Sequence, residues 1–199
     1  MQDDIRVTRP EAGGGGGGIA EAAGRASRGG APAPVHLWDP PFCGDMDLVI
    51  RADGTWLHDG TPIGRPALVR LFANILKREG DAYFLVTPVE KLGITVEDVP
   101  FRAVDLDAGD DALTFTTDVG ERVTAGPDHP LRIAQTEAGP VPYLHVRGGA
   151  GAELEARVDR KTFYRLMELG ETRPVAGEDW FGLASGGAFF EVIRASELP

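Results

Sequence analysis

Carboxylate, histidine and arginine side chains gather in residues 52–65, which read ADGTWLHDGTPIGR. Two Asp-Gly pairs in this stretch raise two alternatives, a cation-binding loop and a pair of tight turns. The calcium-loop spacing of acidic or amide residues ahead of a glycine is absent. Asp-Gly between short apolar runs is instead the strongest local signal for a hairpin. The stretch therefore predicts turns, with Asp53-Gly54 as a two-residue hairpin turn and Gly54 at positive φ.

Arg65 and Arg160 each stand at the start of a predicted helix, where a cation opposes the helix dipole. Two explanations stay open. Each arginine pairs with one of the many acidic side chains, or both converge with free helix N–H groups on one anion. The second explanation requires both guanidinium groups to face a single cavity. Trp56 or Tyr83 would then stack on the ring of a nucleotide-like ligand.

Glu90, Glu97 and Asp98 are the candidates for acid–base chemistry. Glu90 lies with Thr87 and Lys91 just past a predicted strand, where binding loops often occur. A strand end with a solvated Glu-Lys pair is the alternative there. Glu97 and Asp98 would face opposite sides of a strand but could converge on a turn. A hydrolase would need two such groups within hydrogen-bond reach, one of them as general base.

Other reaction signatures are missing from the sequence. The four histidines include no i, i+4 pair, there is no G-x-S-x-G motif, and the six glycines at 13–18 precede Ile19-Ala20 rather than the Lys-Ser or Lys-Thr of a phosphate loop. We therefore expect neither a metal nor a cofactor.

Composition limits the partners that this chain can have. It holds 199 residues, 42% of them hydrophobic, with a formal net charge of −11. Residues 1–34 carry four basic and four acidic residues, so the whole negative excess lies on residues 35–199. Such a body repels nucleic-acid backbones and anionic lipid surfaces. One cysteine allows no internal disulfide, no apolar run has the length of a membrane span, and the first residues are not a secretory signal, so we expect a cytoplasmic protein.

Glycine content and hydrophobic periodicity divide the chain into three parts. Residues 1–34 have little apolar surface to offset the ordering of their glycines, so they predict a flexible tail that folding does not need. Residues 35–99 predict an N-terminal α+β domain, with a helix over 65–79 and a strand over 82–88. Residues 100–199 predict a β-rich domain with one helix over 160–169, capped by Asp159.

An internal echo suggests that the two domains arose by duplication. IGRPALVRLF (63–72) aligns with VDRKTFYRLM (158–167), placing Arg65 on Arg160, and an aromatic strand follows each segment. The order strand, turn, helix, strand thus occurs twice. We predict an α+β fold of two domains built from this duplicated unit, the second domain being mostly antiparallel β with one helix.

The strings WDPPFCGDMDLVIRADGTW, DGTWLHDGTPIGRPALVRLF, YFLVTPVEK and ITVEDVPF occur here in this order. Together they resemble an uncharacterised bacterial family, domain of unknown function 1285, from about residue 35 to the C-terminus. The resemblance implies a duplicated core in two domains, the second loosely similar to pleckstrin-homology domains. It also implies a ligand pocket between the domains, a nucleotide-like ligand and a signalling role, with no established catalytic residues.

Three functions follow from these observations. The first is a non-enzymatic sensor that binds a small anionic or nucleotide-like ligand between its domains, with Arg65, Lys91 and Arg160 holding charge. The second is a hydrolase that uses Glu90, Glu97 or Asp98. The third is a protein-interaction module, whose partner the sequence does not indicate. Whether the three carboxylates share one cleft distinguishes the second function from the first.

Overall fold

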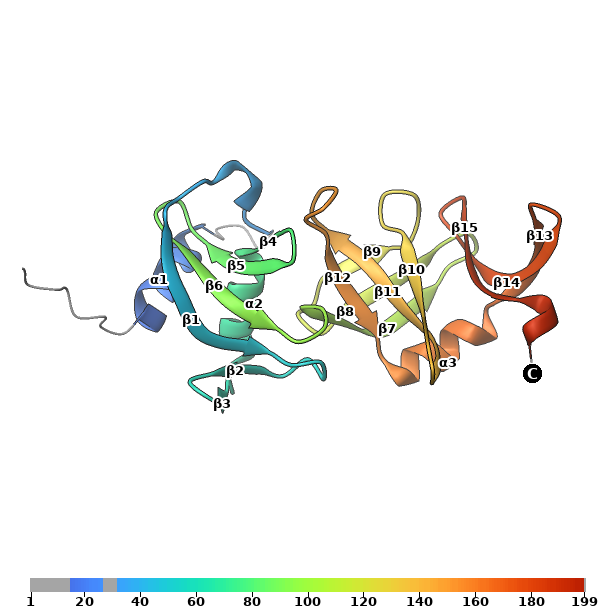
Figure 1. The fold of residues 1–199 in the computed structure, drawn as a ribbon, viewed down its shortest axis with the longest axis horizontal. Helices are drawn as coiled ribbons and strands as arrows, with labels where there is room; N and C mark the ends of the chain where they lie inside the picture. The colour runs from blue at the N-terminus through green and yellow to red at the C-terminus, as the bar shows by residue number, and fades with distance from the viewer. Residues whose placement is uncertain (1–14, 27–31, 199) are drawn as a thin grey trace, which may run out of the picture.

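The computed structural model describes residues 15–26 and 32–198, which form two six-stranded sheets, a three-stranded sheet and three α-helices. Figure 1 shows the three sheets in a row along the long axis of the molecule. The predicted α+β architecture of two domains with a duplicated unit is confirmed. Among the described helices, none is both long and apolar enough to cross a membrane.

The first sheet belongs to the N-terminal domain and has the strand order β3-β2-β1-β6-β5-β4. Its first and last strands, β1 and β6, pair in parallel at the centre, and each heads an antiparallel meander toward one edge. The strands are β1 (Phe42–Ile50), β2 (Trp56–His58), β3 (Thr61–Pro62), β4 (Leu76–Glu79), β5 (Ala82–Val86) and β6 (Lys91–Val96).

The second sheet repeats this order strand for strand, as β9-β8-β7-β12-β11-β10. Again the first and last strands, β7 and β12, form the central parallel pair. The strands are β7 (Phe101–Ala108), β8 (Leu113–Thr117), β9 (Arg122–Thr124), β10 (Leu131–Thr136), β11 (Gly139–Arg147) and β12 (Leu154–Val158). The duplicated unit is thus a whole six-stranded sheet.

The two helices of the sequence echo hold different places in this unit. Helix α2 (Pro66–Asn74) connects the third and fourth strands of the first sheet, whereas α3 (Arg160–Glu168) follows the last strand of the second. Their similar sequences therefore reflect a shared pattern of half-buried helix and not equivalent positions. The Asp159 side chain accepts a hydrogen bond from Thr162 N at 2.7 Å, which confirms the predicted N-cap.

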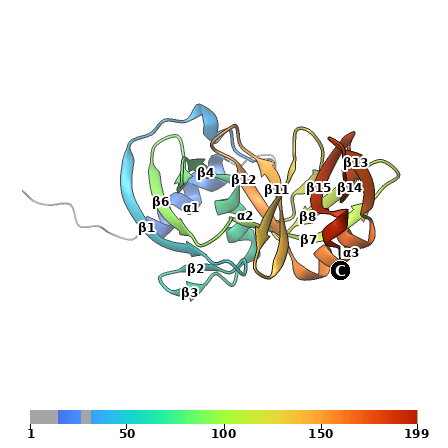
Figure 2. The same ribbon diagram turned by 45° about the vertical axis from the view of Figure 1, so that its right-hand side comes forward.

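The third sheet packs beyond α3 at the C-terminal end, as Figure 2 also shows. It consists of β13 (Glu171–Val175), β14 (Glu178–Ser185) and β15 (Ala188–Arg194), all antiparallel. Short 3-10 turns span Val35–Leu37 and Ala195–Glu197. Leu183 and Val192 carry the third sheet into the continuous hydrophobic core of the molecule.

The predicted helix over 65–79 is too long, because α2 ends at Asn74 and β4 follows at once. Ile75 and Leu76 are fully buried and continue the apolar stripe that periodicity assigned to the helix. Lys77, Arg78 and Glu79 then pair with β5. When the apolar face of a helix continues directly into the buried first residues of a strand, periodicity alone does not show where the helix ends.

The predicted flexible tail is wrong for residues 15–26, which form α1 (Gly15–Ala26). Ile19 and Ala23, one turn apart, are both 0% exposed and belong to the core, where α1 packs on α2. Tertiary burial of these two side chains offsets the poor helix propensity of the glycines. The rest of the predicted tail, residues 1–14 and 27–31, lies outside the described residues.

The two Asp-Gly pairs form different turns. Gly54 has the predicted positive φ of 88°, but Asp53 does not share it, and Arg51 and Thr55 close a longer loop through Arg51 N and Thr55 O at 2.9 Å. The two-residue prediction is wrong here because the Asp53 carboxylate instead accepts from Thr55 N at 2.8 Å. Asp59 and Gly60, with φ of 49° and 70°, form the true two-residue turn between β2 and β3.

Candidate functional site

Three arginines join the two domains, and each donates to a backbone carbonyl across the boundary. Arg102 Nη1 bonds to Ala52 O at 3.0 Å, and Arg78 Nη1 bonds to Glu153 O at 3.3 Å. The third, Arg147, donates to Ala73 O in the last turn of α2 and also pairs with Glu121. The two domains are therefore held together by arginine side chains that donate hydrogen bonds to main-chain oxygens of the other domain.

A cavity of about 610 Å³ opens at this junction, between β4 of the first sheet and β10, β11 and β12 of the second. The N-terminal domain contributes Arg78, and the C-terminal domain contributes Arg132, His145, Glu155 and the glycine-rich turn around Gly148. The wall thus offers two guanidinium groups, an imidazole and carboxylates, with few apolar side chains. Its size lies within the range of small-molecule sites.

His145 fixes the two turns that border the cavity. Its Nδ1 lies 3.0 Å from Asp128 O and its Nε2 lies 3.1 Å from Gly148 O. His129 stacks on the same ring at 5.5 Å between centroids and reaches His145 O through Nδ1 at 3.1 Å. One side chain therefore sets the shape of the rim on two sides.

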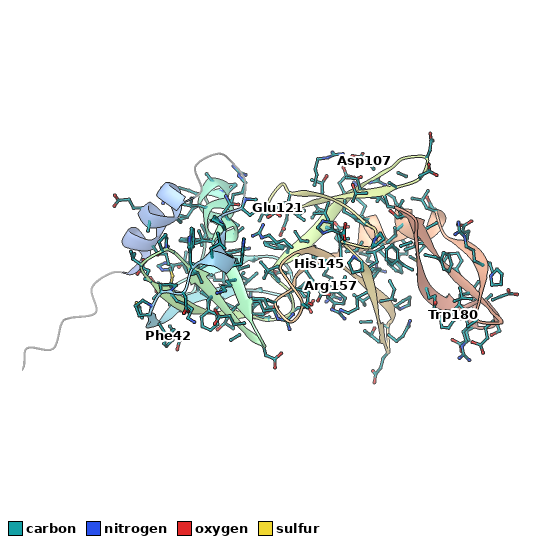
Figure 3. The ribbon with its side chains drawn as sticks, turned by 90° about the horizontal axis from the view of Figure 1, so that it is seen from above. Phe42, Asp107, Glu121, His145, Arg157 and Trp180 are labelled. Carbon is teal, nitrogen blue, oxygen red and sulfur yellow. The ribbon has the colours of Figure 1, made fainter. Side chains whose placement is uncertain are left out.

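Asp98 ties the interdomain segment to the sheet beside the cavity. It accepts from Tyr143 Oη at 3.2 Å and from Arg157 Nη1 at 3.1 Å. Arg132 lies over the Tyr143 ring, 4.2 Å from its centroid, and forms two 2.8 Å hydrogen bonds to Glu155. Figure 3 shows His145 and Arg157 together in the middle of the molecule, with Phe42 and Trp180 near opposite ends. We call Arg78, Tyr83, Asp98, Arg132, Tyr143, His145, Glu155 and Arg157 the interdomain cluster.

Two tyrosines of the interdomain cluster stay protonated. Burial raises the pKa of both Tyr83 and Tyr143, and the nearby carboxylate of Asp98 acts in the same direction. Tyr83 also lies under Arg78, whose guanidinium carbon is 5.6 Å from the ring centroid. The Tyr143 hydroxyl therefore donates to Asp98 at neutral pH, and the Tyr83 hydroxyl also keeps its proton.

Of the nine residues that the sequence singled out, the structure brings Tyr83 and Asp98 into the interdomain cluster. Glu97 lies elsewhere, accepting from Ala52 N at 3.0 Å and pairing with Arg51. Thr87 and Glu90 form a turn of their own, with Thr87 N bonded to Glu90 O at 2.9 Å. The Glu97 and Asp98 carboxylates thus have separate partners, Glu90 is bonded through its main chain, and no hydrogen-bonded acid–base pair forms among the three.

Lys91 and Trp56 have structural surroundings. Lys91 donates to Glu79 Oε2 at 3.0 Å and lies 5.0 Å from the Phe84 ring centroid. Hydrogen bonds from Lys77 and from Lys91 lower the pKa of the Glu79 carboxyl. Trp56 is 4% exposed, and its Nε1 is buried without a hydrogen-bond partner among the described residues.

Arg65 and Arg160 do not meet. Arg65 is the N-cap of α2, one position earlier than predicted, and lines a cavity of the N-terminal domain. Arg160 lies on α3, which Figure 1 places in the other domain, and it bonds to Tyr164 Oη at 3.1 Å. Neither arginine lies within ion-pair distance of a carboxylate among the described residues. The structure therefore supports neither the shared anion site nor the paired-arginine explanation.

Sequence reasoning missed most of the interdomain cluster, namely Arg78, Arg132, Tyr143, His145, Glu155 and Arg157. These residues are scattered over 78–157. The pairing of β10, β11 and β12 makes neighbours of all but Arg78, which reaches them from β4 across the domain boundary. The available signal was the alternation of charged and apolar residues along 153–158, which places Glu155 and Arg157 on one face. Within the described residues, no three His, Cys, Asp or Glu side chains are arranged to hold a metal ion.

Comparison with known proteins gives a family and two solved relatives. Residues 33–99 match the N-terminal domain of the domain of unknown function DUF1285, and residues 100–192 match its C-terminal domain. A DUF1285 family protein from Silicibacter pomeroyi DSS-3 is 54% identical, with a TM-score of 0.78 over 89% of this chain and 96% of that one.

A second crystal structure is a DUF1285 family protein from Shewanella baltica OS155. It is 30% identical, with a TM-score of 0.50 over 62% of this chain and 91% of that one. No curated protein matches the chain. Since the two domain models together span most of the chain and follow each other without a gap, the protein is a member of the DUF1285 family.

Proposed function

We propose that this protein is a non-enzymatic module that binds a small anionic or nucleotide-like ligand between its two domains. The observation that carries the proposal is the 610 Å³ cavity at the junction, whose wall combines Arg78 of the first sheet with side chains of the second. The cavity holds donors and acceptors side by side, as a ligand with a charged group and a polar ring would require.

The position of the cavity supports a signalling role. Arg78 also donates to Glu153 O, one of the three arginine contacts that join the domains. A ligand that engages Arg78 and Arg132 at once would change the affinity of the two domains for each other. Binding would then be coupled to domain arrangement, because a ligand shifts an equilibrium by its differential affinity for the two states.

Thermal-shift measurements with nucleotides and phosphorylated metabolites test the proposal. A ligand at about 100 times its Kd adds about 2.7 kcal/mol of stability, which raises the Tm by about 5–10 °C for a chain of this size. Arg78→Met should remove most of that ligand-induced rise. Arg122→Met is the matched control, since Arg122 is exposed and pairs with exposed Asp107 at 2.7 Å.

The quantity compared is the ligand-induced rise of each variant above its own ligand-free Tm, which separates binding from any loss of basal stability. A ligand that stabilises the parent and Arg78→Met equally would place binding elsewhere. Turnover of the ligand by the parent protein would contradict the non-enzymatic role.

A further inference from the structure

We infer that the N-terminal domain carries a second site, which binds a small amphipathic carboxylate, a molecule with an apolar body and one carboxylate head. The site is a cavity of about 620 Å³ between α1, the β2–β3 hairpin and α2. All of its described lining residues precede residue 73, and none of them lines the interdomain cavity, so the site is independent of the proposed function. We call it the N-domain cavity.

The interior of the N-domain cavity is apolar. Met46, Ile63 and Leu68 are half-buried and pack against the hydrophobic core, while Phe72 is 2% exposed. Burying an apolar ligand against such a surface releases about 25 cal/mol for each Å² removed from water. This interior provides little for a polar ring or a polyphosphate, and it fits an alkyl or aryl body.

The polar groups of the cavity favour a negative charge. Among the lining residues that the structure describes, none is acidic, although the chain has a net charge of −11. Arg65 is the charged residue of this described lining, and no carboxylate of the described residues lies within ion-pair distance of it. His58 also lines the cavity and contacts the exposed Asp59 carboxylate at 3.3 Å.

A lone guanidinium beside an apolar cavity selects one carboxylate. The planar guanidinium binds both oxygens of a carboxylate through parallel hydrogen bonds, which gives direction as well as affinity. Because a single Arg65 neutralises a single charge, a dianionic or polyphosphate head would remain partly uncompensated. The complementarity of charge and apolar surface thus indicates the chemical class of the ligand.

One wall of the cavity comes from outside the residues that the family models match. Ala20 of α1 lines the cavity, whereas the N-terminal family model begins at residue 33. Buried Ile19 and Ala23 anchor α1 on α2 and hold that wall in place. The N-domain cavity is therefore completed by the N-terminal segment of this chain.

Calorimetric titration of the full chain with decanoate, decan-1-ol and decyltrimethylammonium tests the site. These probes share a ten-carbon body and differ in head-group charge, all being used below the concentrations at which they form micelles. We expect decanoate to bind about tenfold more tightly than decan-1-ol, and the cation to bind most weakly. Equal affinity for decanoate and decan-1-ol would overturn the role of Arg65.

Two pairs of variants locate the carboxylate. Arg65→Gln should reduce decanoate affinity about tenfold to the level of decan-1-ol, whereas Arg65→Lys should retain part of it. Thr61→Asp places a carboxylate on the exposed edge of the cavity and should weaken decanoate alone, with isosteric Thr61→Asn as its control. Arg65 and Thr61 are both exposed, so these variants should keep the ligand-free Tm of the parent.

Two controls separate this site from the interdomain cavity. Arg70→Gln removes an exposed cation from the same helix outside the N-domain cavity and should leave decanoate binding unchanged. Arg78→Met should likewise leave it unchanged while removing any ligand of the interdomain cavity. Loss of decanoate binding in Arg78→Met, or its retention in both Arg65→Gln and Thr61→Asp, would refute a site in the N-domain cavity.

Discussion

The two six-stranded sheets share one strand order, yet their hydrophobic faces are covered from different parts of the chain. In the first sheet, α2 enters between the third and fourth strands and brings Phe72 into the core. The second sheet has only residues 125–130 at that point, and α3 arrives after the sixth strand with Leu166 fully buried. Strand pairing is thus the shared property of the two domains, whereas the covering helix is a local solution of each.

The largest expected loss of stability comes from truncating a buried side chain of α2 or α3. Phe72→Ala should lower the free energy of unfolding by about 3–5 kcal/mol, and Leu166→Ala by about 2–5 kcal/mol, because each leaves a cavity in the core. Chemical denaturation of both variants measures the two losses. Val89 is exposed, so Val89→Ala should change the free energy of unfolding by less than about 0.5 kcal/mol. A loss in Val89→Ala as large as in the two core variants would contradict the role of burial.

Helix α1 sharpens the comparison, since it adds a second packed helix to the first domain, against α2. Ile19→Ala should cost about 2–5 kcal/mol, because Ile19 is 0% exposed and packs in the core. The same denaturation measurement checks it. An unchanged unfolding midpoint would mean that α1 contributes nothing to the stability of the first domain.

Arg147 tests whether the domains unfold together. Arg147→Met keeps an unbranched side chain but removes the guanidinium that donates to Ala73 O and to the half-buried Glu121 carboxylate. We expect the free energy of unfolding to fall by about 1–3 kcal/mol. Calorimetry should also show a broader transition as the coupling weakens. Arg122→Met, which breaks an exposed pair, is the control and should cost about 0–1 kcal/mol.

The starts of the two helices differ in their capping, and this difference predicts a smaller effect. Asp159→Ala removes the hydrogen bond to Thr162 N and should destabilise the protein by about 0.5–2 kcal/mol. Arg65, the N-cap of α2, makes no side-chain capping bond, so Arg65→Ala should have little effect on stability. Equal losses in the two variants would show that Asp159 does not act as a cap.

The smallest expected effect is a change in pH dependence. The folded pKa of Glu79 lies below its unfolded value because Lys77 and Lys91 donate to it, so its contribution exists above the unfolded pKa and disappears as the pH falls through the folded pKa. Glu79→Gln should therefore lose up to about 1 kcal/mol at pH 7 and less on acidification. Unfolding measured from pH 3 to pH 7 checks the sign, and an equal loss at both ends would contradict it.

Sequence patterns predicted those features of the fold that depend on neighbouring residues alone. The cap at Asp159, the positive φ of Gly54 and the α+β class with two domains followed from residue types and order, whereas the repeated unit proved to be a whole sheet and not the aligned helices. The helix end at Asn74 did not, because the buried stripe continues through Ile75 and Leu76 into β4. Helix α1 was missed since its stability comes from two buried side chains and not from helix propensity.

The candidate site was less accessible to sequence reasoning than the fold. Tyr83 and Asp98 were named, but the partners of Asp98 lie 45 and 59 positions away, at Tyr143 and Arg157. Arg65 and Arg160 looked equivalent in sequence, but their helices hold different places relative to the two sheets, because the duplication follows the strands and not the helices. Long-range strand register, which single-sequence patterns do not specify, decides which charges meet.

In the three arginine bonds at the domain boundary, the donor position depends on its side chain and the acceptor position does not. Their interdomain acceptors, the main-chain oxygens of Ala52, Ala73 and Glu153, are present whatever side chain stands at those positions. Neither acid titration nor substitution of the acceptor residue removes such an oxygen. Substitution of an acceptor residue therefore leaves its bond possible, whereas loss of the guanidinium at Arg78, Arg102 or Arg147 removes the bond.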